Sequence, residues 1–200
     1  MSRTYFNQRA VIWDESVSER DTTKLERMVK RLNIAPGSAV LDVGAGTGVF
    51  IPFLLSEVGR DGRIVALDFA KEMLRRASAK GFNGNIEFLC ADVTNVPLAD
   101  EIFDVVVCYS SFPHFQDKHA ALAEMNRVIK CGGKLLICHT ASRTKINGIH
   151  GQIPALANDV VPEDAEMLMM LSEAGFSDIE IKDDRESYLC SARKPGLKQF

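Results

Sequence analysis

The chain has 200 residues, of which 46% are hydrophobic and 26% are charged. This length and composition suit one folded domain with a substantial core, and they argue against a disordered, collagen-like or coiled-coil chain. With 24 basic and 27 acidic residues the formal charge is -3 and no basic stripe is present, so we expect neither nucleic acid nor membrane as a partner.

The five cysteines are odd in number, form no C-x-x-C pair and mostly lie inside apolar runs. This usage predicts reduced, buried thiols, not a disulfide framework or a zinc site. The N-terminal residues lack the apolar core of a signal peptide, and the longest apolar run is too short to span a bilayer. We therefore expect a cytoplasmic protein, either monomeric or homodimeric.

Apolar, β-branched runs alternate with segments of helical periodicity from residue 39 to residue 138. The apolar runs predict strands that are buried on both faces, and the intervening segments predict helices. The expected strands are 39–43, 63–67, 86–90, 103–109 and 134–138. The expected helices are 48–58, 70–80 and 117–130, the last ending at Cys131-Gly132-Gly133. This repetition predicts an α/β fold, a doubly wound, mainly parallel sheet with helices on both faces.

The pattern changes after residue 138. A long connection, 140–162, precedes a helix expected at 163–174, and two strand-like runs follow at 178–182 and 187–193. The polar turn between these runs is too short for a parallel crossover, so they predict a C-terminal antiparallel hairpin at the sheet edge. The sheet then has seven strands. No internal repeat or linker divides the chain, so we expect one domain over 1–200.

A glycine turn, Gly44-Ala45-Gly46-Thr47-Gly48, joins the first expected strand to the next helix. Glycines permit a tight turn and let a ligand lie against the backbone, while the helix that follows offers free N–H groups. The spacing is G-x-G-x-G, whereas a dinucleotide fingerprint would need glycine at Val49. No Lys-Ser/Thr pair follows, which disfavours a triphosphate loop, and an NAD-dependent oxidoreductase is the weaker enzyme-class rival.

Acidic residues end the second and third expected strands. Asp68 lies 20 residues beyond Gly48, where a carboxylate can accept hydrogen bonds from both hydroxyls of a ribose. Asp92 ends the next strand and is placed to meet an exocyclic amine of a purine. Each acid has an alternative role as a local cap, in the case of Asp68 for the helix at 70–80. Together with the glycine turn they predict a nucleoside pocket.

In this order, these features resemble the class I S-adenosylmethionine-dependent methyltransferases of the small-molecule type. The resemblance covers nearly the whole chain and includes 5–14, the glycine turn, Lys71-Glu72-Met73-Leu74, 103–107 and 126–135. Cys131 departs from it, because a proline is usual there. The resemblance implies S-adenosyl-L-methionine as cofactor and one methyltransferase domain.

The resemblance also implies the role of each cofactor residue. Asp42 and the turn residues would hold the amino-acid end, Asp68 the ribose, and Asp92 with Val93 the adenine. The full expected set is Asp42, Gly44, Ala45, Gly46, Gly48, Asp68, Phe69, Asp92, Val93 and Ser110.

The expected reaction is methyl transfer by in-line displacement, which requires a nucleophile held about 3–3.5 Å from the methyl carbon and the exclusion of water. Residues 108–115 lack the Asn/Asp-Pro-Pro-aromatic run that resembles enzymes acting on DNA or RNA bases. We therefore expect a small-molecule acceptor, whose nucleophile is oxygen, nitrogen, carbon or sulfur. The alternative is a non-catalytic, S-adenosylmethionine-binding regulatory protein of the same fold.

Three of the four histidines follow expected strands or lie in the long connection. Ligands of open α/β sheets bind beyond the carboxyl ends of the strands, so His114, His139 and His150 should converge there. His139 or His114 would orient the acceptor or act as a general base. A three-imidazole metal site and ordinary capping roles are the alternatives, and we expect no metal.

We expect residues 110–115 and 139–153 to hold the acceptor. A helical lid over residues 1–30 and a substrate-side insertion, 140–162, would select it. If the insertion is helical, Arg143, Asn147 and His150 share one face that could line the acceptor pocket. Arg143 would pair with an acidic group of the acceptor or lie on the surface. The N-terminal aromatic residues form either part of the lid or a packing patch; they are Tyr5, Phe6 and Trp13.

Overall fold

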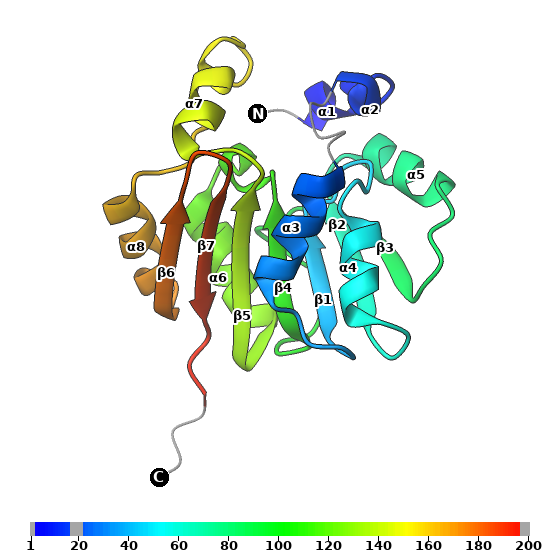
Figure 1. Cartoon of the computed structure of the whole chain (residues 1–200), viewed down its shortest axis with the longest axis vertical. Coiled ribbons are helices and arrows are strands. Elements are labelled where there is room, and N and C mark those ends of the chain that lie inside the picture. Colours follow the sequence, from blue (N-terminus) through cyan, green and yellow to red (C-terminus); the bar gives the residue numbers. More distant parts are fainter. Residues whose placement is uncertain (1–2, 17–21, 197–200) are drawn as a thin grey trace.

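The computed structural model describes residues 3–16 and 22–196. A seven-stranded sheet of order β3-β2-β1-β4-β5-β7-β6 forms its centre (Figure 1). The strands are β1 (Ala39–Val43), β2 (Arg63–Asp68), β3 (Ile86–Cys90), β4 (Phe103–Tyr109), β5 (Ile129–His139), β6 (Ser177–Asp183) and β7 (Tyr188–Arg193). Only β7 runs against its neighbours, β5 and β6. The predicted fold, with its C-terminal antiparallel hairpin, is confirmed.

Helices cover both faces of the sheet. They are α1 (Arg3–Arg9), α2 (Trp13–Ser16), α3 (Thr22–Leu32), α4 (Ile51–Val58), α5 (Lys71–Ala79), the short 3-10 helix η1 (Phe112–His114), α6 (Lys118–Val128), α7 (Arg143–Gly151) and α8 (Asp164–Glu173). Helices α1, α2 and α7 lie beyond the end of the sheet toward which β5 points (Figure 1). Within residues 3–16 and 22–196, no helix has the length and apolar content needed to cross a bilayer.

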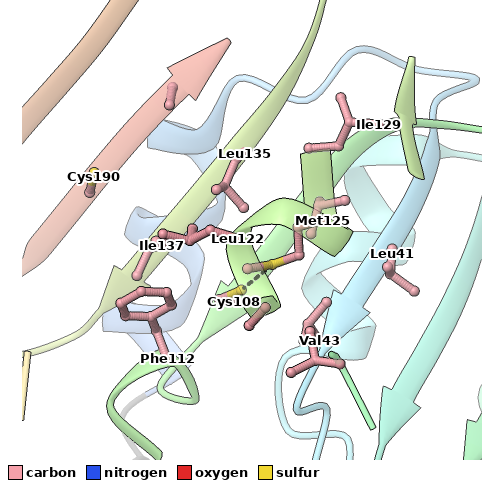
Figure 2. Close-up of a cluster of buried hydrophobic side chains, with 14 of the residues drawn as sticks. Leu41, Val43, Cys108, Phe112, Leu122, Met125, Ile129, Leu135, Ile137 and Cys190 are labelled. Atoms are coloured by element: carbon pink, nitrogen blue, oxygen red, sulfur yellow. Dashed lines mark hydrogen bonds between the residues drawn. The ribbon is translucent and has the colours of Figure 1, made fainter. Parts of the chain in front are cut away.

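Alternate residues of the central strands supply two separate cores. Val106 and Cys108 pack in the cluster that contains α6 and α8, whereas Val105 and Val107 pack in the cluster with α3 and α4. Figure 2 shows Met125 of α6 above β4, with its sulfur 3.5 Å from that of Cys108. Burial on both faces explains why the strands are continuous apolar runs in the sequence. All five cysteines are free, and three of them are buried.

The junction between α6 and β5 differs from the prediction. Helix α6 ends at Val128, and β5 begins at once instead of after a glycine turn. Gly132 has a φ of 79°, and a Cβ on Gly133 would lie 2.8 Å from the Asp104 carbonyl oxygen. The two glycines therefore occupy an irregular part of β5, where its register against β4 shifts between Phe103 and Val105.

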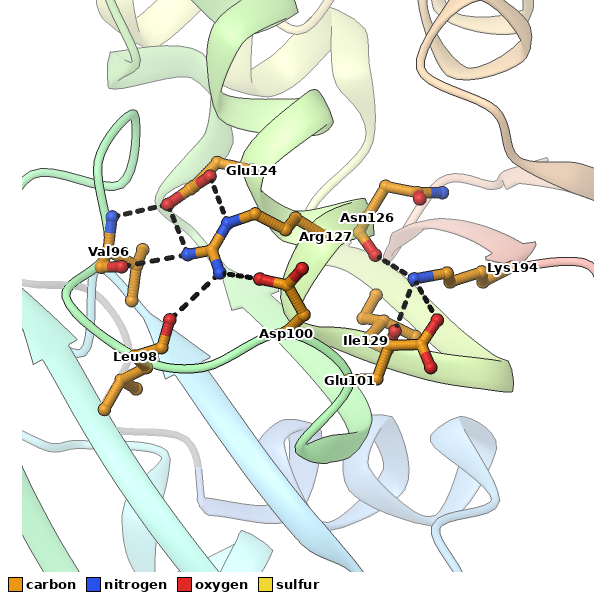
Figure 3. A network of polar contacts seen from close by, with 9 residues as sticks. All are labelled: Val96, Leu98, Asp100, Glu101, Glu124, Asn126, Arg127, Ile129 and Lys194. Atoms are coloured by element: carbon orange, nitrogen blue, oxygen red, sulfur yellow. Dashed lines mark hydrogen bonds and ion pairs between the residues drawn. The ribbon is translucent and has the colours of Figure 1, made fainter.

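Arg127 and Lys194 join loops to the ends of α6 and β5 (Figure 3). The Arg127 guanidinium donates to the carboxylates of Glu124 and Asp100 and to two loop carbonyls, those of Val96 and Leu98. Lys194 donates to the carbonyls of Asn126 and Ile129, at 2.9 Å each. The segment 126–135, which contributes to the family resemblance, therefore has a structural role away from the strand ends that hold ligands.

Candidate cofactor and acceptor site

A cavity of about 290 Å³ lies at the carboxyl ends of β1, β2 and β4. Parallel sheets of this kind bind ligands in such a position, where the strand order reverses. Ten of the predicted site residues line it: Asp42, Gly44, Ala45, Gly46, Asp68, Phe69, Asp92, Val93, Ser110 and His114. Five others do not belong to the lining: Gly48, His139, Arg143, Asn147 and His150.

Two glycines of the turn, Gly44 and Gly46, line the cavity, and the third, Gly48, does not. A Cβ on Gly44 would lie 2.4 Å from the Cβ of Ser111, so only glycine allows the loop after β4 to approach here. Gly46 has a φ of 56°, and a Cβ there would meet nothing within 4 Å. A Cβ on Gly48 would instead lie 3.0 Å from the Phe82 ring. Gly48 therefore packs against Phe82, outside the cavity lining, and its expected contact with the cofactor remains a prediction.

Asp68 connects the end of β2 with the glycine turn. Its Oδ2 accepts a hydrogen bond of 2.9 Å from the Gly46 N–H, and its Oδ1 accepts one of 2.8 Å from the Ala70 N–H. Burial raises the pKa of this carboxyl to about 6, although the backbone hydrogen bonds favour its ionised form. Asp68 thus fixes the turn and the start of α5 while it also lines the cavity.

Asp42, at the end of β1, is only 2% exposed. Its Oδ2 has no hydrogen-bond partner among the described residues. Burial, with the nearby charge of Asp68, raises the pKa of Asp42 to about 7. A buried carboxylate oxygen without a donor is costly in the free protein and becomes favourable when a cationic group reaches it. The cavity is therefore suited to a ligand that carries positive charge.

Asp92 lies at the exposed rim of the cavity. Its Oδ1 accepts hydrogen bonds from the backbone N–H and the hydroxyl of Thr94, at 3.0 and 2.8 Å. This is the local capping role that the sequence left open. The second carboxylate oxygen is in none of these bonds, so the geometry is also compatible with a ligand contact.

The N-terminal helices cover the cavity. Phe6 of α1 and Trp13 of α2 line it, and the Phe6 ring contacts those of Phe69 and His114 at centroid distances of 5.6 and 5.4 Å. Phe6 and Trp13 therefore pack against neighbouring rings and also cover the cavity, so both expected roles hold together. The expected lid, 1–30, includes residues 1–2 and 17–21, which lie outside the described residues.

Polar contacts hold these helices over the turn. The Asn7 side-chain oxygen accepts a hydrogen bond of 3.0 Å from the Glu72 N–H of α5. Asp14 accepts a hydrogen bond from the Thr47 hydroxyl and pairs with Lys80 at 3.0 Å. The cover is thus joined both to α5 and to the glycine turn.

Three histidines lie together beside the cavity, as their positions along the chain predict. His114 Nδ1 is 2.7 Å from Asp159 Oδ2, and His150 Nδ1 donates to the Asp159 carbonyl oxygen. The His114 and His150 rings are 5.0 Å apart, and both interact electrostatically with His139. In residues 3–16 and 22–196, no group of three or more His, Cys, Asp or Glu side chains is arranged to hold a metal ion.

Burial keeps His114 and His139 neutral near pH 7. It lowers the pKa of His114, an effect that the hydrogen bond with Asp159 opposes only in part. Burial lowers the pKa of His139 to about 3, and repulsion from His114 and His150 in their protonated forms adds to the effect. His139 lies beside the Tyr188 ring, outside the cavity lining. Of the three histidines, His114 is the one in the cavity wall, and the expected roles of His114 and His139 toward the acceptor remain predictions.

Helix α7 forms within the insertion, but its polar face does not reach the cavity. Arg143 pairs with Glu163 at 3.4 Å, with Asp183 at 3.7 Å and with Asp164. The Asn147 amide exchanges two hydrogen bonds with the Val161 backbone, at 3.0 and 2.8 Å. The face shared by Arg143, Asn147 and His150 is present, and its side chains contact residues 159–164 and Asp183. Their expected contact with the acceptor remains a prediction.

Several lining residues were not predicted. Tyr109 and Phe50 line the cavity and stack with ring centroids 4.3 Å apart, whereas Phe115 belongs to the segment 110–115 that we expect to hold the acceptor. The position of Tyr109 at the end of an expected strand could have identified it, because the carboxyl ends of strands form the site. Asp159 carries no such signal, since it is 45 residues from its partner His114 and lies in an irregular segment.

The comparisons with known proteins agree with this site. A family model described as "Methyltransferase domain" matches residues 41–137. A demethylmenaquinone methyltransferase of Staphylococcus saprophyticus is 28% identical over 188 residues, which cover 82% of this chain and 81% of that protein. A ubiquinone/menaquinone biosynthesis C-methyltransferase UbiE of a Shewanella species is 30% identical over 174 residues, covering 82% and 68%.

Solved structures show the same fold. A SAM-dependent methyltransferase from Aquifex aeolicus superposes with a TM-score of 0.75 at 22% identity, covering 97% of this chain and 99% of that one. An S-adenosyl-L-methionine-dependent methyltransferase from Methanococcus maripaludis gives a TM-score of 0.76 at 23% identity. Fold, cavity and sequence relatives agree: the chain belongs to the class I S-adenosylmethionine-dependent methyltransferases and uses S-adenosylmethionine as its cofactor.

Proposed function

We propose that this enzyme transfers the methyl group to a carbon atom of a small aromatic acceptor that carries an ionisable hydroxyl. The observation that carries the proposal is a neutral histidine, His114, in the wall of a cavity that is otherwise largely aromatic and apolar. The names of the relatives, which include C-methyltransferases of ubiquinone and menaquinone biosynthesis, support a ring carbon as the acceptor atom.

In this proposal the cofactor occupies the part of the cavity beside β1 and β2. When bound, S-adenosylmethionine supplies an electrophilic methyl group on a sulfonium. Asp42 would bind its ammonium group, since its Oδ2 is buried and has no other donor in the described chain. Asp68 would accept from the ribose hydroxyls, Gly46 would leave room for the ligand, and Asp92 with Val93 would lie at the adenine.

The rest of the cavity would hold the acceptor ring. Phe6, Trp13, Phe50, Tyr109 and Phe115 line the cavity, and such rings would exclude water from the reacting atoms. Exclusion of water protects the electrophile from hydrolysis and fixes the geometry of an in-line displacement.

His114 would act as the general base. A ring carbon becomes a strong nucleophile when the adjacent hydroxyl is ionised, so removal of that proton activates the acceptor. The imidazole is neutral near pH 7 and can take the proton. Methyl transfer would form a carbon–carbon bond as the carbon–sulfur bond breaks, with S-adenosylhomocysteine as the leaving group. The ring carbon would then release its proton to solvent as the aromatic system is restored, and the oxygen would recover its proton from His114.

The test is turnover with S-adenosylmethionine carrying a ¹³C-labelled methyl group. The acceptors are a short-chain, reduced analogue of demethylmenaquinone, a catechol, a primary amine and a thiol. We expect a carbon-bound methyl group on the naphthohydroquinone, identified by NMR of the product. Label on oxygen, nitrogen or sulfur would overturn the choice of acceptor atom. Tight cofactor binding without turnover of any acceptor would favour a non-catalytic binding protein.

A further inference from the structure

We infer that Asp159 is a positioning residue that holds the His114 imidazole as the Nδ1–H tautomer, so that Nε2 is the nitrogen that accepts the acceptor's proton. The inference deepens the proposed function and rests on it, because it assumes that His114 faces the acceptor. No sequence motif marks Asp159, which lies between α7 and α8.

The contact between the two residues is short and shielded. His114 Nδ1 and Asp159 Oδ2 are 2.7 Å apart, and the two side chains are only 14% and 10% exposed. Phe6, which also lines the cavity, packs against the His114 ring at a centroid distance of 5.4 Å. Shielding from water strengthens this hydrogen bond and restricts rotation of the ring.

The charges of the pair determine the tautomer. Burial opposes ionisation of Asp159, but the hydrogen bond from His114 and the charge of Lys118 help to keep its pKa below the ordinary value. An ionised carboxylate only accepts hydrogen bonds, so the proton of the contact lies on His114 Nδ1. Burial also keeps His114 neutral, which leaves a lone pair on Nε2. The titratable groups facing the pair are His150, Lys118 and His139.

Helix α7 holds Asp159 in place. His150 donates to the Asp159 carbonyl oxygen, and Asn147 binds both polar backbone groups of Val161. Arg143 donates to the Pro162 carbonyl oxygen at 3.2 Å and pairs with Asp164. The polar face of α7 therefore acts on the cavity indirectly, through the segment that carries the Asp159 carboxylate.

The first test reads the tautomer directly and needs no acceptor. Nitrogen-15 NMR of the imidazoles distinguishes Nδ1–H from Nε2–H, and only four histidines have to be assigned, His114 by its loss in His114→Gln. We expect Nδ1–H at His114 in the native protein and a changed tautomer mixture in Asp159→Asn. Nε2–H in the native protein, or the same tautomer in both proteins, would overturn the inference.

The second test measures activity with the acceptor identified above. Asp159→Asn should lower kcat by about 10²–10⁴-fold and leave KM and cofactor affinity within about twofold. The acidic limb of the pH profile should move to lower pH, because loss of the anion lowers the pKa of His114. Asp159→Glu, which keeps the charge, should recover part of the rate.

Glu163→Gln is the matched control, since it removes one carboxylate from the same segment and Glu163 contacts Arg143 instead of a histidine. Its kcat should stay within about twofold of the native value. An Asp159→Asn enzyme with native kcat and pH profile would refute the positioning role. A native Nδ1–H tautomer without turnover of any acceptor would instead refute the proposed function alone.

Discussion

Two buried carboxyl groups, Asp42 and Asp68, dominate the electrostatics of the cavity. Both have a raised pKa, about 7 and about 6, mainly because burial disfavours their charged forms. Each would be stabilised in its ionised form by a ligand that offers a cation or hydroxyl donors. Cofactor binding should therefore be coupled to the release of protons.

The first prediction follows for the cofactor affinity. Between pH 5 and pH 8, S-adenosylmethionine should bind more tightly as pH rises, because ionised Asp42 attracts its positive charge. Calorimetry in buffers of different ionisation enthalpy should detect proton release on the acidic side of this range. In the Asp42→Asn variant, the affinity for S-adenosylmethionine should depend less on pH. Equal pH dependence for native and variant proteins would remove Asp42 from the cofactor site.

A ligand without the amino-acid end provides a further control. Methylthioadenosine keeps the ribose and adenine but has no ammonium or sulfonium group. Its affinity should vary less with pH than that of S-adenosylmethionine. If both ligands vary alike, the coupling belongs to Asp68 and the ribose and not to Asp42.

For single residues, the sequence predicts best the positions that lie at or directly after the end of a strand. Asp42, Asp68 and Gly46 are examples, because a strand followed by a glycine turn leaves them few places to lie. Gly48 belongs to the same motif but packs against Phe82, a contact that depends on the tertiary structure. Asp159 meets His114 only through the path of a long connection, which no local pattern encodes.

Helix α7 shows how an element can support a site that it does not line. Its amphipathic pattern predicts one polar face, and that face exists in the structure. The partners of the face are Asp159, Val161 and the start of α8. The pattern alone could not show this, because periodicity identifies a face without identifying what it contacts.

Asn147→Ala tests this role of α7. The change leaves the Val161 N–H and carbonyl without their side-chain partner, so the free energy of unfolding should fall by about 1–3 kcal/mol in urea titration. The rate should fall as well, because the segment that carries Asp159 loosens. Lys145→Ala, at an exposed position of the same helix, should change the free energy of unfolding by no more than about 0.5 kcal/mol and leave the rate unchanged. Equal effects of both variants would contradict the argument.

The parallel sheet is the part of the molecule that the sequence predicts best. Its central strands are covered on both faces, so each is a continuous apolar run bounded by turns. The sequence predicts the start of β5 wrongly, at residue 134 instead of Ile129. Gly132 and Gly133 look like the end of a helix, whereas they form an irregular part of the strand against β4. Pairing with a neighbouring strand decided the structure there.

Buried titratable groups also make the stability of the whole molecule depend on pH in two opposing ways. The pKa of Asp42 is raised on folding, so its contribution is present at low pH and is lost as pH rises from about 4 to about 7. The pKa of His139 is lowered to about 3, so its contribution is present above pH 6.5 and is lost as pH falls.

Two variants separate these contributions. Relative to the native protein, Asp42→Asn should gain stability as pH rises from 4.5 to 8, by a few kcal/mol. His139→Gln should show the reverse trend, gaining relative stability as pH falls below 6. Denaturant titration of the free proteins across this range measures both differences. A pH-independent difference for either variant would show that its pKa is not shifted by folding.

Trp13 is the only tryptophan of the chain, and it lies in the wall of the cavity. Indole emission is sensitive to solvent and to nearby rings, so the intrinsic fluorescence of the native protein arises almost wholly from this one place. The enzyme therefore contains its own optical probe of cofactor and acceptor binding. Equilibrium and stopped-flow titrations need no added dye, and the order in which the two ligands enter can be read from a single emission band.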